Sequence, residues 1–282
     1  MRLASSVRNA ERIRDITEIA AKHGFGYWSE RHQLRNLLPK RLRGLPKPMG
    51  TRGEHMRKMF EELGPTFVKF GQLLSTRPDA LPVDVIVELR KLQDDVPPFP
   101  IEIAEGTIER ELGLTIERLF LDFNENPIAA ASIGQVHRAV LPNGDEVIVK
   151  VQRPDADATI RADIDLLYQL AHLIRDHGPG DLFIDPVGIV DQFARGIRNE
   201  LDYRVEARNA ERFRENFDGD HTVHIPKVYW QYSTSRVLTL EWVHGTPLAD
   251  IDMVAMDLAE RRQLAKTIAE CGRRQIYMDG VF

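Results

Sequence analysis

The chain has 282 residues and carries 38 basic and 43 acidic side chains, which give a formal net charge of −5 at pH 7. This length allows one or two domains with a substantial core. The charge balance gives no reason to expect nucleic acid as a partner. The single cysteine, Cys271, excludes an intrachain disulfide framework and a cysteine zinc site, and it fits a reducing compartment. No run approaches the roughly 20 apolar residues of a membrane-spanning helix.

The N-terminal part is expected to be helical in parts, and residues 31–58 are rich in Arg, Lys and His. Such a basic stretch can bind phospholipid headgroups, but a solvated helical face and loop has the same composition. Over residues 54–75, apolar side chains recur every three or four positions, as in a helix with one buried face. Gly64-Pro65 predicts that this segment forms two helices, because proline is tolerated in the first turn of the second one.

On the second of these helices, Lys69 and Gln72 are three positions apart and share a face. Taken alone, the two residues are typical of a solvated polar face. Further along, the sequence predicts a short helix over 84–92, a stiff proline linker over 96–100, a helix over 101–112 that ends at Gly113, and a first strand over 119–123.

Residues 127–152 predict a hairpin preceded by a run of small residues. The first strand of this hairpin shows alternation of Val136, Arg138 and Val140 with His137, Ala139 and Leu141. The return strand shows alternation of Val147, Val149 and Val151 with Ile148, Lys150 and Gln152. Asn143-Gly144 between the two runs is a strong hairpin signal. Small residues from Ala129 to Gly134 let backbone N–H groups approach a ligand and hold phosphates. With Lys150 on the return strand, this is the layout of a kinase nucleotide site; a surface hairpin with a solvated lysine is an equal alternative.

Two helices are expected next, over 156–177 and 187–217. The buried stripe expected on the second helix is Phe193, Ile197, Leu201 and Val205. Beside this stripe, Asp202 and Glu206 are four positions apart and share a face, whereas Glu200 points elsewhere. Such acids are usually solvated, and an acid at the boundary of the core needs a partner if it is buried.

The C-terminal part predicts two strands and a helix. The strands cover 223–230 and 236–242, and the second ends at Glu241-Trp242-Val243, which fits a kinase hinge, where backbone groups bind the adenine edge. The last helix is expected over 258–278, and its candidate core positions are Leu264, Ile268, Cys271 and Ile276.

Several of these motifs occur together in one order. Lys69-Phe70-Gly71-Gln72 resembles the KxGQ motif of the UbiB/AarF family of atypical protein kinase-like proteins, and residues 129–137 resemble the alanine-rich loop of that family. Val147-Ile148-Val149-Lys150 resembles its strand-lysine motif, Glu200-Leu201-Asp202 resembles its ExD motif, and Glu206 resembles its helix-C glutamate. The resemblance runs from about Met56 to the end of the chain.

The resemblance implies an α+β fold: a protein kinase-like N-lobe, with an antiparallel sheet plus helix C, and an N-terminal helical extension that carries the KxGQ motif. It implies binding of ATP or ADP, with Mg²⁺ in the full-length protein, and an ATPase or small-molecule kinase activity that supports ubiquinone biosynthesis. Lys150 would contact the α- and β-phosphates and pair with Glu206. The implied nucleotide-binding residues are Ala129, Ala130, Ala131, Ser132, Ile133, Gly134, Val136, Lys150, Glu241 and Val243, with Leu240 as gatekeeper. Lys69 and Gln72 would face Glu200 and Asp202 as regulatory residues.

One departure from the family pattern is large. The catalytic-loop aspartate and asparagine and the metal-binding Asp-Phe-Gly follow a Gly-Val-Phe ending in that family, and this sequence contains neither His-x-Asp nor Asp-Phe-Gly. We therefore expect a fragment or truncated product that lacks most of the C-lobe, holds no metal by itself and shows no turnover alone. The expected domains are a helical and basic segment over 1–50, a KxGQ extension over 51–115, an N-lobe over 116–244 and the start of a C-lobe over 245–282.

The resemblance also implies partners and a location. Besides nucleotide, the implied partners are membrane lipids, ubiquinone precursors and other biosynthetic proteins. The implied location is cytoplasmic, with membrane association at full length. Two other functions stay open, a non-catalytic lipid- or partner-binding scaffold and an aminoglycoside-phosphotransferase-like kinase. The KxGQ helix argues against the latter, because such kinases lack this extension.

Overall fold

A computed structural model of the protein describes residues 12, 14–16, 18–20, 22–23, 50–93, 96–177 and 185–280. Most of the predicted N-terminal segment over 1–50 therefore lies outside the described residues. The chain divides into two compact units. The first comprises Met1–Pro97, Ala130–Ile133 and Pro154–Arg198, and the second comprises Pro98–Ala129, Gly134–Arg153 and Asn199–Phe282. Among the helices in the described part, none is long and apolar enough to cross a membrane.

The first unit is helical. Its helices are α3 (Arg52–Leu63), α4 (Pro65–Ser75), α5 (Val83–Leu89), α8 (Ala156–His177) and most of α9 (Pro186–Glu200). Thr51 begins α3 with a capping box in which its side chain and that of Glu54 each bond the backbone of the other. Gly64, at a φ of 98°, separates α3 from α4, and Pro65 is the first residue of α4. The predicted division into two helices is therefore confirmed.

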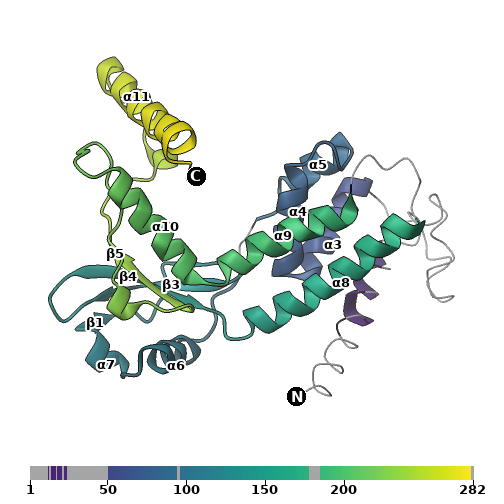
Figure 1. The fold of residues 1–282 in the computed structure, drawn as a ribbon, viewed down its shortest axis with the longest axis horizontal. Coiled ribbons are helices and arrows are strands. Elements are labelled where there is room, and N and C mark those ends of the chain that lie inside the picture. The colour runs from purple at the N-terminus through teal and green to yellow at the C-terminus, as the bar shows by residue number, and fades with distance from the viewer. Residues whose placement is uncertain are drawn as a thin grey trace. The chain divides into compact units, whose positions relative to one another are not determined.

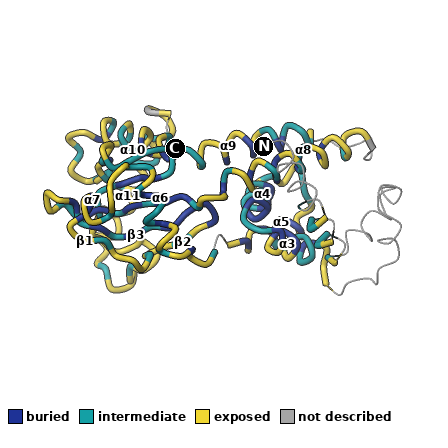
Figure 2. Tube along the Cα trace, turned by 90° about the horizontal axis from the view of Figure 1, so that it is seen from below, coloured by how far each residue is buried: buried dark blue, intermediate teal, exposed yellow. Residues whose placement is uncertain are grey.

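Aromatic side chains fill the interior of this helical unit. The ring centres of Phe60 and Phe67 are 6.2 Å apart, and Phe70 contacts Phe193 of α9 edge to face at 5.2 Å. Figure 2 shows the resulting burial along α4. Gly71 makes room for these rings, because a Cβ at this position would lie 2.6 Å from the ring of Phe60.

A buried ion pair ties an N-terminal residue to this unit. The Asp163 side chain on α8 is 1% exposed, and its two oxygens accept hydrogen bonds from Arg12 Nε at 2.7 Å and Arg12 Nη2 at 3.1 Å. Arg12 Nη2 also donates to the Leu63 carbonyl of α3 at 2.7 Å. A buried carboxylate is costly unless it is paired, so this contact holds Arg12 against both helices.

The second unit is built around an antiparallel sheet with the strand order β1-β3-β4-β5, in which β2 also pairs with β3. The strands are β1 (Asp122–Phe123), β2 (Ala129–Ala130), β3 (Gly134–Val140), β4 (Glu146–Gln152) and β5 (Val237–Glu241). β3 and β4 form the predicted hairpin, and Gly144 in its turn has a φ of 88°. Figure 1 shows α6 (Ile101–Leu112) and α7 (Ile116–Leu119) on one side of the sheet and α10 (Tyr203–Asn216) on the other. The unit thus has the predicted α+β fold class.

The two faces of this sheet differ in how far they are covered. The closed face, which packs on α6 and α7, consists of buried residues: Gln135, His137, Ala139, Val147, Val149, Val151, Val237 and Thr239. The open face carries several residues that are only partly buried: Val136, Arg138, Ile148, Lys150 and Leu240. Leu238 on the same face has no exposed surface, because it packs with Tyr203 and Ala207 of α10. Side chains alternate between the faces along each strand, so the strand register alone assigns each residue to its face.

The segment predicted as one helix over 187–217 is two helices. α9 ends at Glu200, and α10 begins at Tyr203 with Asp202 as its N-cap. The Asp202 carboxylate accepts a hydrogen bond from Arg204 N at 3.1 Å, which is the role that aspartate favours at this position. Asp202 therefore caps α10 instead of sharing a helical face with Glu206. The last two residues of the predicted buried stripe, Leu201 and Val205, are only partly buried.

Other predicted elements differ from the structure. The strand expected over 119–123 is a two-residue strand, because residues 116–119 are helical. The strand expected over 223–230 is reduced to one bridge, between Val228 and Leu240. Pro226 in this segment has no N–H to donate to a strand neighbour.

The last predicted helix is α11 (Leu258–Arg274), which contains no buried residue. The candidate core positions are partly or fully exposed; Leu264, Ile268 and Cys271 lie on α11, and Ile276 follows it. Within the described residues these positions therefore form an apolar face that is not buried. Helical periodicity identifies a face that can be buried, but it does not supply the element that would cover it.

Candidate functional site

Lys150 lies on the open face at the centre of the sheet. Strand register places it opposite Val136 of β3 and Leu238 of β5. Its ammonium lies 2.7 Å from Glu206 Oε2 of α10 and 4.7 Å from the ring centre of Tyr203. A lysine on a strand of β-branched residues is thus held by a carboxylate and an aromatic ring from one helix.

The start of α10 explains how Glu206 reaches this position. After the Asp202 cap, the backbone N–H of Tyr203 donates to Ser235 O at 3.0 Å, which anchors the first turn beside β5. Gln152 at the end of β4 donates its side-chain amide to Leu201 O at 2.8 Å. These two bonds fix the helix entry to the sheet, so a glutamate in the first turn comes within reach of β4.

The segment after β5 contains a backbone donor that no described residue satisfies. Among the described residues, none accepts a hydrogen bond from the Val243 N–H, and Val243 is 45% exposed. The Glu241 carboxylate is used structurally, because it accepts from Lys227 N at 3.0 Å and contacts His224 Nε2 at 3.1 Å. Val243 therefore presents an available backbone donor, while the side chain of Glu241 is occupied.

A polar cluster holds this segment against the hairpin. Trp242 N donates to Glu146 O at 3.0 Å, and the Arg138 guanidinium lies 5.5 Å from the ring centre of Trp242. His244 Nε2 lies 2.8 Å from Glu146 Oε2, and Arg138 forms an ion pair with the other carboxylate oxygen. The hydrogen bonds from Arg138 and then His244 lower the pKa of Glu146. The cluster fixes the backbone next to Val243.

The run of small residues from Ala129 to Gly134 is tightly packed where it enters β3. Ile128 N donates to Val136 O at 2.8 Å, which aligns the start of the run with β3. Ala129 and Ala131 are exposed, whereas Ser132, Ile133 and Gly134 are buried. A Cβ on Gly134 would lie 2.4 Å from Tyr203 Oη and 2.4 Å from Val151 O. Glycine is therefore required where the run enters β3.

The remaining site residues predicted from the sequence belong to different units. Lys69 and Gln72 belong to the first unit, where Gln72 Nε2 donates to Leu92 O at 3.2 Å. Glu200 and Asp202 belong to the second. Hydrogen bonds from the Arg204 side chain and backbone lower the pKa of Asp202. That Lys69 and Gln72 face Glu200 and Asp202 stays a prediction.

A buried polar chain beneath β3 was missed by sequence reasoning. Phe99 N donates to Gln135 Oε1 at 2.9 Å, Gln135 Nε2 lies 2.9 Å from His137 Nε2, and His137 Nδ1 lies 2.8 Å from Asn124 O. Because the amide nitrogen of Gln135 can only donate, His137 is neutral and carries its proton on Nδ1. Burial lowers the pKa of His137, and the bond to Asn124 offsets part of this shift. Gln135 and His137 alternate with Val136 along the strand, and this pattern in the sequence indicates that the two polar side chains share one face.

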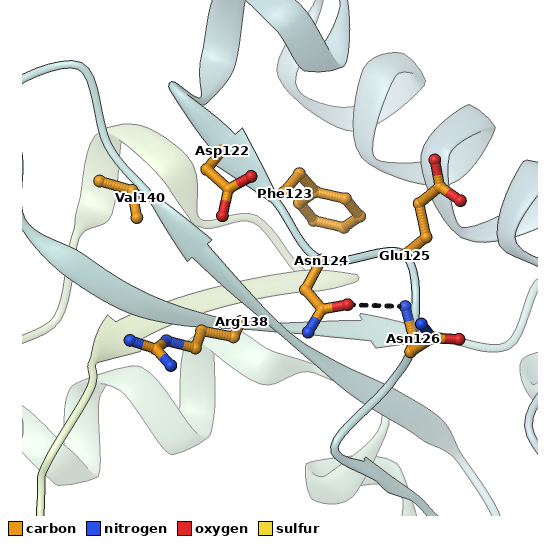
Figure 3. Close-up of a pocket in the computed structure, with 7 residues that line it drawn as sticks. All are labelled: Asp122, Phe123, Asn124, Glu125, Asn126, Arg138 and Val140. Carbon is orange, nitrogen blue, oxygen red and sulfur yellow. Dashed lines mark hydrogen bonds between the residues drawn. The ribbon is translucent and has the colours of Figure 1, made fainter.

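A separate hollow of about 500 Å³ lies at the β1 edge of the sheet and is lined by Asp122, Phe123, Asn124, Glu125, Asn126, Arg138 and Val140. Figure 3 shows the Asn124 side chain bonded to the backbone of Asn126, which closes the turn beside it. The lining does not include Lys150, Glu206 or Val243. In the described ranges, no group of three or more His, Cys, Asp or Glu side chains is arranged to hold a metal ion.

A strand lysine paired with a glutamate from a helix is the arrangement of kinase-like N-lobes. The ABC1 atypical kinase-like domain family matches residues 91–282. The chain belongs to this family, the UbiB/AarF family of atypical kinase-like proteins, as the sequence motifs predicted.

Relatives and a solved structure agree with this assignment. The chain is 43% identical over 237 residues to "Probable protein kinase UbiB" of Marinobacter nauticus, covering 84% of this chain and 43% of the relative. It is 39% identical over 246 residues to the protein of the same name from Cellvibrio japonicus, covering 87% and 44%. The structure of the Rv3197–erythromycin complex from Mycobacterium tuberculosis matches with a TM-score of 0.52 and 32% identity, covering 72% of this chain and 51% of that chain. The chain thus spans less than half the length of these two curated relatives.

Proposed function

We propose that this chain forms the nucleotide-binding part of an atypical kinase and binds ATP or ADP on the open face of its sheet. The observation that carries the proposal is the Lys150–Glu206 pair, at 2.7 Å, on that face. The Lys150 side chain is 32% exposed, so a ligand can reach it while the contact with Glu206 fixes its position. A phosphate there would gain a charge-assisted hydrogen bond.

The surroundings of Lys150 support a base as well as a phosphate. Val136, Ile148 and Leu240 present partly buried apolar side chains on the same face, and they could cover one side of a planar ring. The Val243 N–H beyond Leu240 is available to an acceptor on the ring edge. Ligand pockets usually combine an apolar lining with a few fixed polar groups of this kind.

Magnesium fits the described residues less well than nucleotide does. The part of the chain that the structure describes holds no cluster of acidic, His or Cys side chains suited to a metal ion. The residues that support the proposal are therefore those that could bind and orient a nucleotide. We assign nucleotide binding to this chain and propose that catalysis, in support of ubiquinone biosynthesis, belongs to the whole protein.

Calorimetric titration of the full chain with ADP tests this function. Lys150→Met keeps an unbranched side chain but removes the charge, and we expect the affinity for ADP to fall roughly tenfold or more, about 1.4 kcal/mol. Lys227→Met is the matched control. The Lys227 ammonium also lies 4.7 Å from a tyrosine ring, but that ring, of Tyr229, packs against the core cluster of the closed face.

The control variant should bind ADP as the parent protein does. Equal ADP affinity of Lys150→Met and the parent would reject the assignment of Lys150. A parent protein that binds lipid or a protein partner but no nucleotide would instead favour the scaffold function. Binding of ADP without any effect of Lys150 would place the nucleotide elsewhere in the chain.

A further inference from the structure

The hydroxyl of Tyr203 is buried without a hydrogen-bond partner among the described residues. Tyr203 is 1% exposed and is the first residue of α10. Its ring packs with Ala207, Val228 and Leu238 in a small core cluster. Native proteins rarely leave a buried hydroxyl unpaired, because the group loses its bonds to water and gains none in exchange. Packing explains the ring of Tyr203 but not its oxygen.

The oxygen lies at the end of the small-residue run. The Cβ that Gly134 lacks would lie 2.4 Å from Tyr203 Oη, so the hydroxyl occupies the space of a side chain at the first residue of β3. Because Gly134 has no side chain, the Tyr203 hydroxyl can lie directly against the backbone of β3 at this position. Glycine is also the residue whose backbone is freest to change conformation.

The ring of Tyr203 carries a second functional contact. The Lys150 ammonium lies 4.7 Å from its centre and 2.7 Å from Glu206 Oε2. Burial raises the pKa of Tyr203, and the nearby carboxylates of Glu206 and Glu200 raise it further. The phenol therefore keeps its proton at neutral pH and is able to donate a hydrogen bond close to the ammonium.

We propose that Tyr203 Oη donates a hydrogen bond to a phosphate oxygen of the nucleotide that Lys150 holds. This inference rests on the function proposed above and adds a phosphate-binding residue to it. Phosphate oxygens are strong acceptors, and a phosphate at Lys150 would be near the ring that carries this hydroxyl. Gly134 lies against the hydroxyl, and the phosphate replaces that contact when the backbone at Gly134 shifts.

The variant Tyr203→Phe tests the inference, because it keeps the ring, its core contacts and the Lys150 contact, and removes only the oxygen. By calorimetry on the full chain, we expect the affinity for ADP to fall roughly tenfold, the effect of losing one hydrogen bond to a charged group. The affinity for adenosine, which has no phosphate, should not change. The thermal midpoint without ligand should stay the same or rise, since an unpaired buried hydroxyl is removed.

Tyr229→Phe is the matched control. Its hydroxyl donates to Asp145 Oδ2 at 2.9 Å, and a lysine ammonium also lies 4.7 Å from its ring. This variant should lower the thermal midpoint and leave ADP binding unchanged. Equal ADP affinity of Tyr203→Phe and a parent that binds ADP would overturn this inference alone. The same loss for ADP and adenosine would also overturn it. A parent that binds no ADP would overturn the proposed function and this inference together.

Discussion

The two faces of the sheet in the second unit differ in how far their side chains are buried, although the same strands form both. On the closed face, Val147, Val149 and Val151 have no exposed surface and pack on α6 and α7. On the open face, the intervening residues Ile148 and Lys150 are only partly buried. Even the polar residues Gln135 and His137 of the closed face are buried, and they are bonded to one another.

This difference shows how one hairpin separates stability from binding. Burial of the valines stabilises the sheet through their apolar area, so the residues between them are free to carry a charge. The Lys150 side chain is partly exposed, whereas Val149 and Val151 on either side of it are buried and hold the strand against the core. The comparison predicts that substitutions at adjacent positions have very different consequences.

The largest effect is expected for Val149→Asp on the closed face. A carboxylate at a position with 0% exposure would be buried without a partner. We expect a loss of about 4 kcal/mol or more in the free energy of unfolding, which is a large share of the roughly 5–15 kcal/mol of a typical domain. Urea denaturation followed by circular dichroism measures this loss. Ile148→Asp, one residue away on the open face, should cost less than half as much. Equal losses for the two variants would mean that the faces are equally covered.

A smaller, pH-dependent effect is expected from His137 on the closed face. Its pKa is lowered in the folded protein, so the unfolded chain takes up a proton that the folded protein does not. The contribution to stability is present above the ordinary histidine pKa of about 6.5 and is lost as pH falls below it, at no more than about 1.4 kcal/mol per pH unit.

Urea denaturation of the parent and of His137→Gln between about pH 7 and pH 5 tests this effect. The stability of the parent should fall more steeply toward acid than that of the variant, because the variant lacks the titrating group. Parallel curves would show that His137 is not held neutral. The comparison uses differences in slope, so any overall loss of stability in the variant does not affect it.

The smallest effect on stability is expected for Glu206→Gln on the open face. The side chains of Lys150 and Glu206 are 32% and 46% exposed, and exposed ion pairs contribute little because water screens them. We expect the free energy of unfolding to change by less than about 1 kcal/mol, measured by urea denaturation. A loss of more than about 2 kcal/mol would show that the pair stabilises the fold as a buried pair does.

The amino-acid sequence by itself determined the family, the two helices around Gly64-Pro65 and the β3–β4 hairpin. These features depend on local chemistry: proline at a helix start, glycine in a turn and alternation along a strand. Alternation also assigned Lys150 and Val149 to opposite faces. The motif order was sufficient for the family, because the KxGQ, alanine-rich and strand-lysine motifs occur together.

Only the tertiary structure decided which residues lie together at the candidate site. The break between α9 and α10 was hidden, because helical periodicity continues through Leu201 and Val205 while Asp202 caps a new helix. Lys150 and Glu206, which form the ion pair, are 56 positions apart in the sequence. The buried hydroxyl of Tyr203, which no described residue bonds, lies against Gly134, another residue far from it in the sequence. Local patterns specify conformation and face, whereas such contacts depend on how separate elements pack, and this is set by the shape and volume of the whole core.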